Sequence, residues 1–236
     1  MYFRFSGEGH TDLGLCAMAA AHCQGSDYLP GPLAIMVSQI VEDSQGYSII
    51  ECEQCGFTPE EELVRKAEKI KSSKKPPRLP GRKRAKETHY FFVNARALAQ
   101  IAKSMSAEKS DDVVAILFRD TDGTASAGRG NWDDKWKSMI DGFVEEEFER
   151  GVPMIPKPKS EAWLLNALKY PNGDSLEERS GNDKSPNSLK LELEQFLGTV
   201  NKRIDLCQLV ENRKIDYNKI NLPSFIQFKE RLEKVI

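Results

Sequence analysis

The fold is decided by the stretch Val113-Val114-Ala115-Ile116-Leu117-Phe118, which runs directly into Arg119-Asp120-Thr121-Asp122-Gly123. An unbroken apolar run rich in β-branched residues is typical of a strand that is buried on both faces, as strands of parallel sheets are. Gly123 then allows the chain to turn sharply. We therefore predict a buried strand over residues 113–118, with the carboxylates of Asp120 and Asp122 at its carboxyl end.

A second acidic cluster follows the first predicted strand. The run Met1-Tyr2-Phe3-Arg4-Phe5 leads directly into Ser6-Gly7-Glu8-Gly9-His10-Thr11-Asp12. In an open α/β sheet the ligand crevice lies outside the carboxyl ends of the strands, so loops that leave neighbouring parallel strands meet there. We therefore expect four carboxylates to converge: Glu8, Asp12, Asp120 and Asp122. They would repel one another, and a hard divalent cation such as Mg2+, which takes oxygen ligands, relieves that repulsion.

Each cluster also has a simpler interpretation. Asp120 and Asp122 fit a turn with an Asx cap, and Glu8 by itself fits a solvated loop residue. The occurrence of two acidic clusters at two strand ends favours a cation site over these separate interpretations.

The same residues resemble the Toprim family, the Mg2+-binding catalytic domain of topoisomerases, bacterial primases and the overcoming-lysogenization-defect nucleases. Glu8 matches the Glu at the end of that family's first strand, and Asp120 and Asp122 match its later Asp-x-Asp. Asp12 matches a second acidic residue of the nuclease branch. Ser160-Glu161-Ala162-Trp163-Leu164-Leu165 looks like a downstream motif in compact Toprim-like proteins, several of which are encoded beside ATPases. The resemblance covers residues 1–168.

The resemblance implies a nuclease that uses Mg2+ or Mn2+ to hydrolyse phosphodiester bonds of DNA or RNA. It implies metal ligands at Glu8, Asp12, Asp120, Asp122 and Glu161, with Glu8 also a candidate general acid or base. Lys157 and Lys159 both lie where one catalytic lysine is expected, so that assignment stays open. The resemblance further implies an antiviral defence setting with an ATPase partner.

Two other functions also account for part of the sequence. Asp120-Thr121-Asp122-Gly123-Thr124 resembles the nucleophile motif of haloacid-dehalogenase phosphatases, in which Asp120 would attack phosphate and Asp122 would act as the acid. Such enzymes need a later acidic pair at a strand end, and Asp133-Asp134 is too near and is predicted on a helix. The remaining alternative is a non-catalytic binding partner of an ATPase, with the helical tail as its docking surface.

A basic segment occupies residues 65–87. Eleven Lys and Arg residues lie between Arg65 and Lys86, opposed there only by Glu68 and interrupted by Pro76, Pro77, Pro80 and Gly81. Such a segment cannot form a core, so we predict an exposed helix-loop arm. It is either a solubilising loop or a surface that contacts nucleic-acid phosphates. The candidate contact residues are Lys74, Lys75, Arg82, Lys83, Arg84 and Lys86.

The 236 residues, 39% of them hydrophobic, are enough for a substantial α/β core, and the net charge of −2 indicates no global attraction to nucleic acid. We expect a Toprim-like (Rossmann-like), mostly parallel sheet flanked by helices over residues 1–168, with the arm inserted. A loop or linker over 169–187 and a helical C-terminal extension over 188–236, packed on the same domain, should follow.

The coarse element pattern gives further expectations. We predict helices over 11–23, 59–71, 92–105, 132–150 and 223–235, and strands over 1–5, 152–156 and, more weakly, 47–52. Five cysteines without paired metal-ligand spacing suggest reduced thiols rather than a zinc site. We find neither an 18-residue apolar stretch nor a signal peptide, so we expect a soluble, cytoplasmic protein without a membrane contact.

Overall fold

The structure, a computed structural model, describes residues 1–9, 11–73, 86–121, 131–170, 175–198 and 203–236. Its strands are β1 (Tyr2–Gly7), β2 (Gly14–Cys16), β3 (Cys23–Gln24), β4 (Tyr28–Pro30), β5 (Cys55–Pro59), β6 (Val113–Phe118) and β7 (Gly151–Met154). Its helices are α1 (Pro32–Gln45), α2 (Glu60–Ser73), α3 (Lys86–Lys109), α4 (Trp132–Glu145), α5 (Ser160–Leu168), α6 (Leu189–Leu197), α7 (Arg203–Glu211) and α8 (Pro223–Val235). Short 3-10 turns lie at Gly25–Asp27, Leu176–Glu178 and Tyr217–Lys219.

The described elements form an α/β fold around a five-stranded sheet with the order β3-β5-β1-β6-β7. The four strands β5, β1, β6 and β7 are parallel, whereas β3 pairs antiparallel with β5 at one edge. Strands β2 and β4 form a separate antiparallel pair. The expectation of a mostly parallel sheet flanked by helices is confirmed.

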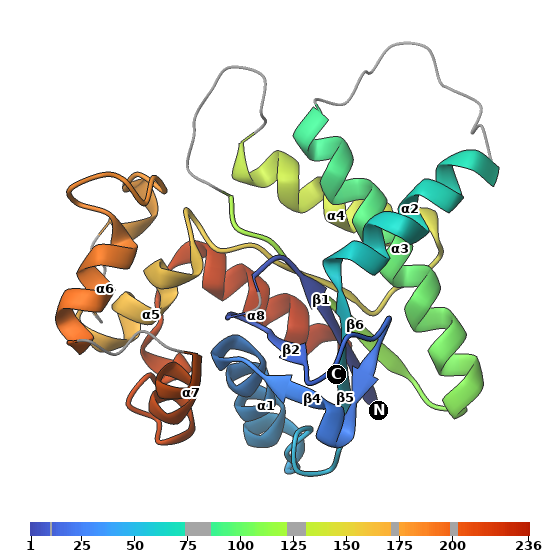
Figure 1. Cartoon of the computed structure of the whole chain (residues 1–236), viewed down its shortest axis with the longest axis horizontal. Coiled ribbons are helices and arrows are strands. Elements are labelled where there is room, and N and C mark those ends of the chain that lie inside the picture. Colours follow the sequence, from blue (N-terminus) through green and yellow to red (C-terminus); the bar gives the residue numbers. More distant parts are fainter. Residues whose placement is uncertain (10, 74–85, 122–130, 171–174, 199–202) are drawn as a thin grey trace.

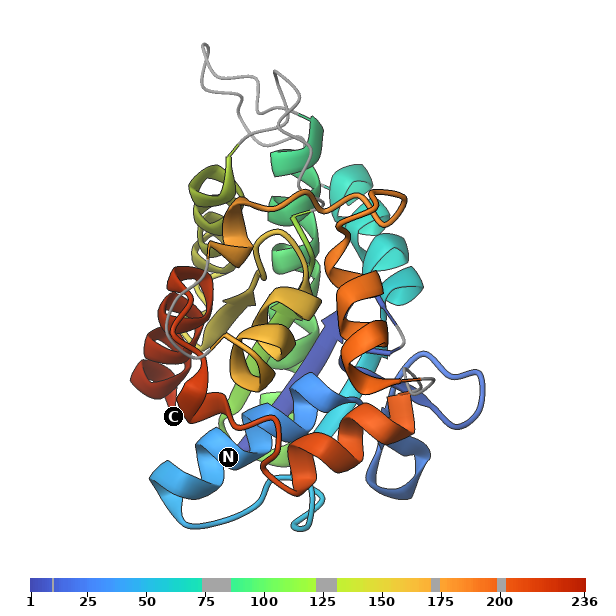
Figure 2. The ribbon, with the colours of Figure 1, turned by 90° about the vertical axis from the view of Figure 1, so that its left-hand side faces the viewer.

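Two helical layers cover the sheet, one on each face (Figures 1 and 2). Alternation along β1 and β6 sends successive side chains to opposite faces. Phe3, Phe5 and Ile116 join the apolar core beneath α1, α5, α6, α7 and α8. Tyr2 and Ala115 join the core beneath α2, α3 and α4. Both faces of the central strands are therefore buried, as the unbroken apolar run of β6 predicts.

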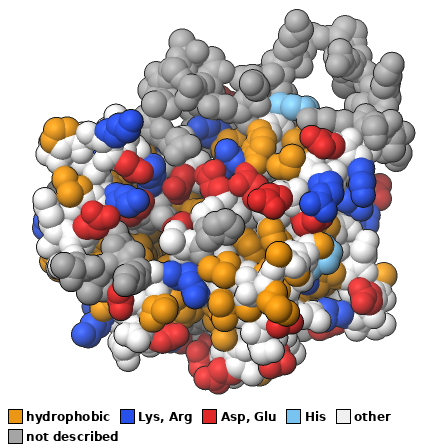
Figure 3. All heavy atoms as spheres, viewed as in Figure 1, with side chains coloured by type: hydrophobic (Ala, Val, Ile, Leu, Met, Phe, Trp, Pro, Cys, Tyr) orange, Lys and Arg blue, Asp and Glu red, His pale blue; other side chains and the backbone are white. Residues whose placement is uncertain are grey.

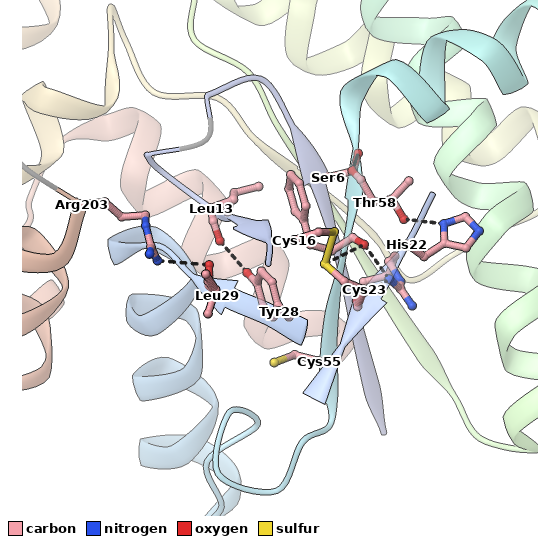
Figure 4. Close-up of a disulfide and its surroundings, with 12 residues drawn as sticks. Ser6, Leu13, Cys16, His22, Cys23, Tyr28, Leu29, Cys55, Thr58 and Arg203 are labelled. Carbon is pink, nitrogen blue, oxygen red and sulfur yellow. Dashed lines mark hydrogen bonds between the residues drawn. A yellow bond between two sulfur atoms is a disulfide. The ribbon is translucent and has the colours of Figure 1, made fainter. Parts of the chain in front are cut away.

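The predicted helix over residues 11–23 is wrong. That segment contains β2 and β3, and a disulfide between Cys16 and Cys23 joins them (Figure 4). Gly14 has φ of +112°, and a Cβ there would lie 2.2 Å from the carbonyl oxygen of Leu29. The run of small residues has helical propensity but no amphipathic face to bury, so pairing with β4 and β5 prevails. The prediction of five reduced thiols is wrong for this pair, whereas Cys52, Cys55 and Cys207 are free.

The strand predicted over residues 47–52 is also wrong. Most of those residues lie in turns, and the strand that follows α1 and pairs with β1 is β5, a few residues later. Residues 33–41, another short apolar run, form most of α1, which is buried from Pro32 to Val41. A helix covered on every side lacks an amphipathic stripe, so its short apolar run looks like a buried strand.

Other predicted elements are confirmed with shifted ends. β6 spans residues 113–118 as predicted, α2 and α8 match their predicted ranges closely, and α3 contains the predicted helix within a longer one. The helix predicted over 132–150 ends earlier, at Glu145. Glu147 has φ of +52°, and Phe148 then folds back against Phe143 at 6.2 Å between ring centroids. This turn leads the chain into β7.

Candidate active site

The strand order creates a topological switch point between β1 and β6. From β1 the chain crosses by α1 to β5 on one side, whereas β6 and β7 lie on the other side. The loops that leave β1 and β6 therefore diverge to opposite faces and open a crevice, which is where ligands bind in open α/β sheets. Glu8 follows β1 and Asp120 follows β6 by two residues, so both predicted residues lie at this crevice.

The two strand ends approach each other closely. Gly7 pairs with Phe118 in the parallel register and has φ of +155°. A Cβ on Gly7 would lie 2.2 Å from the Phe118 carbonyl oxygen, so only glycine fits here. The Glu8 side chain crosses the gap, and its Oε1 accepts a hydrogen bond from the backbone N–H of Asp120 at 2.8 Å. Its Oε2 lies 3.3 Å from Nη2 of Arg119.

Asp120 also connects β6 with the loop that follows β7. Its Oδ1 accepts a hydrogen bond from the backbone N–H of Ser160, the first residue of α5, at 3.0 Å. Thr121 donates through Oγ1 to the carbonyl oxygens of Pro156 and Pro158, at 3.2 and 3.0 Å. Three strand ends therefore meet around Asp120, and the first N–H of α5 points at its carboxylate.

Burial raises the pKa values of three carboxylates in the crevice, and repulsion by neighbouring carboxylates adds to the effect for two of them. Burial raises the pKa of Asp120 well above its ordinary value, and Asp12, Glu161 and Glu8 raise it further. Burial likewise raises the pKa values of Asp12 and of Glu161, and the Asp12 charge adds to the effect on Glu161. Asp12, Asp120 and Glu161 therefore lie close enough to disfavour one another's ionisation. Figure 3, in the view of Figure 1, shows a band of acidic side chains across the middle of the molecule.

Of the two candidate lysines, Lys159 is the one whose charge acts on this cluster. Its ammonium group lowers the pKa values of Asp12, Asp120 and Glu161, against the raising effects of burial and of the other carboxylates. Its Nζ also pairs with Asp183 at 2.9 Å. Lys157 lies on the same loop but is not among the main charges that act on these three carboxylates.

Several predicted residues lie outside the described part of the chain. Asp122 is one, so its place in the site stays a prediction. The same holds for five of the six candidate phosphate contacts, Lys74, Lys75, Arg82, Lys83 and Arg84, and for the side chain of Lys86 at the start of α3.

The described side chains of the crevice can be considered as ligands for a metal ion. Within the ranges that the structure describes, no group of three or more His, Cys, Asp or Glu side chains is arranged to hold a metal. The chemistry of the described donors nevertheless fits a hard divalent cation, because all of them are carboxylate oxygens. Moreover, Oε2 of Glu161 is buried and has no hydrogen-bond partner among the described residues. A cation would satisfy this oxygen and relieve the repulsion around Asp120.

Three contributors to this region were absent from the predicted site: Arg119, Glu60 and Tyr90. Arg119 pairs through Nη1 with Oε1 of Glu60 at 3.0 Å and lies over the Tyr90 ring, 4.0 Å from its centroid. Glu60 follows β5 directly. It would have been recognised as a third acidic strand end if that strand had been predicted at residues 55–59 rather than 47–52.

Models of known protein families, curated proteins and solved structures were all searched, and none matches this chain. In the described ranges, no helix combines the length and apolar character needed to cross a membrane. The site must therefore be interpreted from its own geometry.

Proposed function

We propose that this chain is a divalent-cation-dependent nuclease that hydrolyses phosphodiester bonds of DNA or RNA. The observation that carries the proposal is the convergence of Glu8, Asp12, Asp120 and Glu161 at the switch point, where burial raises the pKa values of the last three and neighbouring carboxylates raise those of Asp120 and Glu161 further. Such a cluster is poorly suited to bind a polyanion unless cations occupy it. When bound, Mg2+ or Mn2+ would supply an activated water and offset charge on the phosphate.

The residues of the chain then have separate roles. Asp120, Asp12 and Glu161 hold the cations, with Asp122 proposed as a further ligand. Glu8, fixed by the Asp120 N–H, is placed to bind a cation or to exchange a proton with the reacting water or leaving oxygen. Lys159 brings a positive charge to the same crevice, where it would offset negative charge on the phosphate in the transition state.

The more detailed proposals rest on the Toprim resemblance rather than on the geometry. These are the assignment to that family, an ATPase partner, a role in antiviral defence and a cytoplasmic location. Three strand ends meet at Asp120, and this arrangement is compatible with a Rossmann-like nuclease. The fold supports this part of the proposal.

The haloacid-dehalogenase alternative has less support. It needs a second acidic pair, and Asp133 and Asp134 lie in the first turn of α4. There, Asp134 forms a capping box with Asn131, which occupies its carboxylate in stabilising the helix. That alternative also leaves Glu8 and Asp12 without a role.

The test is cleavage of plasmid DNA and tRNA across a titration of Mg2+ and Mn2+. We expect metal-dependent cleavage, and we expect Asp120→Ala and Asp122→Ala each to abolish it while both proteins stay folded. Asp133→Asn, an exposed acidic control on α4, should keep full activity. Absence of metal-dependent cleavage of either nucleic acid would contradict the proposal.

Glu8→Gln separates the two enzyme hypotheses. The substitution should inactivate a nuclease that needs this carboxylate, because glutamine cannot bind the cation as an anion or exchange the proton. A haloacid-dehalogenase phosphatase would keep its activity on small phosphate esters. Retained phosphatase activity in the Glu8→Gln protein, without nuclease activity in the wild type, would replace our assignment with that one.

A further inference from the structure

Arg119 joins the acidic crevice to the helices on one face of the sheet. Its Nη2 lies 3.3 Å from Oε2 of Glu8, which follows β1. Its Nη1 lies 3.0 Å from Oε1 of Glu60, the first residue of α2. The guanidinium carbon lies 4.0 Å from the ring centroid of Tyr90 and 5.7 Å from that of Phe91, both on α3. One side chain from the end of β6 thus contacts residues of three other elements.

These contacts use properties specific to arginine. A guanidinium is a rigid planar fork, so it can pair with two carboxylates at once while one of its faces lies on an aromatic ring. The Tyr90 hydroxyl donates to the same Oε1 of Glu60, which closes a ring of contacts around Arg119. The Arg119 side chain is only 26% exposed, so solvent screens these contacts incompletely. Its orientation is therefore determined by Glu60 and Tyr90.

Glu8 is in turn fixed by Arg119 and by the backbone. Its Oε1 accepts from the Asp120 N–H, and its Oε2 faces the guanidinium. A carboxylate offers about four acceptor positions, so these two contacts orient Glu8 without preventing it from binding a cation. Partners of this kind, which hold a metal-binding side chain in place, typically contribute 10- to 100-fold to metal affinity.

We propose that Arg119 is a positioning residue that holds the Glu8 carboxylate in the orientation that binds the divalent cation. Through Arg119, a change in the contacts made by Glu60 or Tyr90 alters the position of Glu8. This inference rests on the proposed cation site, and it adds a residue that does not contact the cation itself. A purely electrostatic role of Arg119 would change metal affinity in the opposite direction. If Arg119 acted only through its charge, it would repel the cation, and its removal would tighten metal binding.

The experiment is a titration of the metal-free, full-length protein with Mn2+, followed by electron paramagnetic resonance of the free ion. This readout needs neither substrate nor catalysis. We expect Arg119→Gln to weaken Mn2+ binding about tenfold. Arg119→Lys should weaken it as well, because one ammonium group keeps the charge but cannot span Glu8 and Glu60 together.

Arg96→Gln is the matched control. Arg96 pairs with Glu146 at 2.5 Å and lies over the Phe92 ring at 5.8 Å, so it makes the same kinds of contact on α3 away from the crevice. Loss of the Arg96 contacts should leave Mn2+ affinity unchanged, although it should lower thermal stability about as much as Arg119→Gln does. An effect on metal affinity that is confined to the Arg119 variants therefore cannot arise from general loosening of α3.

Glu60→Gln tests the transmission. Alone it should weaken Mn2+ binding several-fold, because Arg119 loses the partner that orients it. In the Arg119→Gln background it should have no further effect, since coupled residues are non-additive. Additive effects would overturn the transmission from Glu60, and unchanged or tighter Mn2+ binding in Arg119→Gln would overturn the positioning role. Failure of the wild-type protein to bind Mn2+ would instead refute the cation site itself and the inference with it.

Discussion

At the scale of single residues, Asp120 concentrates the unfavourable electrostatics of the molecule. It accepts the Ser160 N–H, donates its own N–H to Glu8, and still has a pKa raised by burial and by Asp12 and Glu161. The one backbone N–H that donates to the Asp120 carboxylate therefore does not offset the cost of collecting carboxylates in one crevice. The proposed cation would relieve this imbalance, whereas a structural cap would need one carboxylate only.

The raised pKa of Asp120 predicts how the stability of the metal-free protein depends on pH. A carboxyl group whose pKa is higher in the folded than in the unfolded chain binds more protons when folded, so stability falls as pH rises. Stability is lost as pH rises from the ordinary carboxyl pKa of about 3.9 to above the raised pKa of the folded protein. The folded protein without metal should therefore be less stable at neutral pH than near about pH 5.

Chemical denaturation in a chelator at the two pH values measures this effect. Asp120→Asn should be stabilised at neutral pH and should lose much of the pH dependence, because asparagine can still accept the Ser160 N–H but carries no charge. Asp133→Asn, exposed in the first turn of α4, should change neither quantity. Equal pH dependence in the Asp120→Asn and wild-type proteins would show that the cluster is not destabilising.

At the scale of elements, α2 and α3 connect the acidic crevice to the basic segment. Glu60 begins α2 and Tyr90 lies about one turn into α3, and both contact Arg119. The described part of α2 also carries exposed basic side chains, among them Arg65 and Lys69. The proposed nuclease would need positive charge outside its acidic site to hold its substrate, and the basic segment over residues 65–87 is where the sequence concentrates it.

The basic segment is expected to contact phosphates without reading bases. Affinity for nucleic acid should then fall steeply with salt, each phosphate contact adding about 0.7 to 0.9 to the slope of log K against log salt. Replacement by Ser of six residues should flatten the slope and weaken all sequences about equally: Lys74, Lys75, Arg82, Lys83, Arg84 and Lys86. Binding is best measured by fluorescence anisotropy in Asp120→Ala protein, so that cleavage does not interfere.

A control variant carries six Ser replacements at exposed lysines outside residues 65–87: Lys103, Lys137, Lys184, Lys214, Lys219 and Lys234. This variant changes the net charge equally, so a slope that flattens only with the basic segment assigns the contacts to it. The same slope in both variants would reduce the segment to a solubilising loop.

At the scale of the whole molecule, the C-terminal helices complete the core on one face of the sheet. Phe225 and Phe228 of α8 lie 5.1 and 5.6 Å from the Trp163 ring of α5, measured between centroids, and the Trp163 indole donates to Ser224 Oγ at 2.8 Å. All three aromatic side chains are fully buried. Since α5 carries Glu161 and donates a hydrogen bond to Asp120, this packing holds in place the helix that positions both side chains.

Phe228→Ala tests whether these helices belong to one cooperative unit. Loss of this buried ring should lower the free energy of unfolding by about 3–5 kcal/mol. The urea transition should stay single when it is followed by tryptophan fluorescence and by circular dichroism. Ile226→Ala, 42% exposed on the same helix, should change stability by less than about 0.5 kcal/mol. Two separate transitions would show that residues 188–236 unfold on their own.

Local sequence was sufficient for the elements whose pattern is periodic or uniformly apolar over a strand length. β1 and β6 were predicted because both lie in the middle of the sheet, and Glu8 and Asp120 followed from them because parallel strands end at one edge. Long-range packing decided the rest. Whether an apolar run becomes β5 or α1 depends on which neighbours cover it, and the short strand from Gly14 forms through pairing with β4, beyond β3 in the sequence. The role of Arg119 could not be found from the residues next to it in the sequence. Its partners Glu60 and Tyr90 are far from it along the chain, and they meet it only when the sheet brings β1, α2 and α3 together.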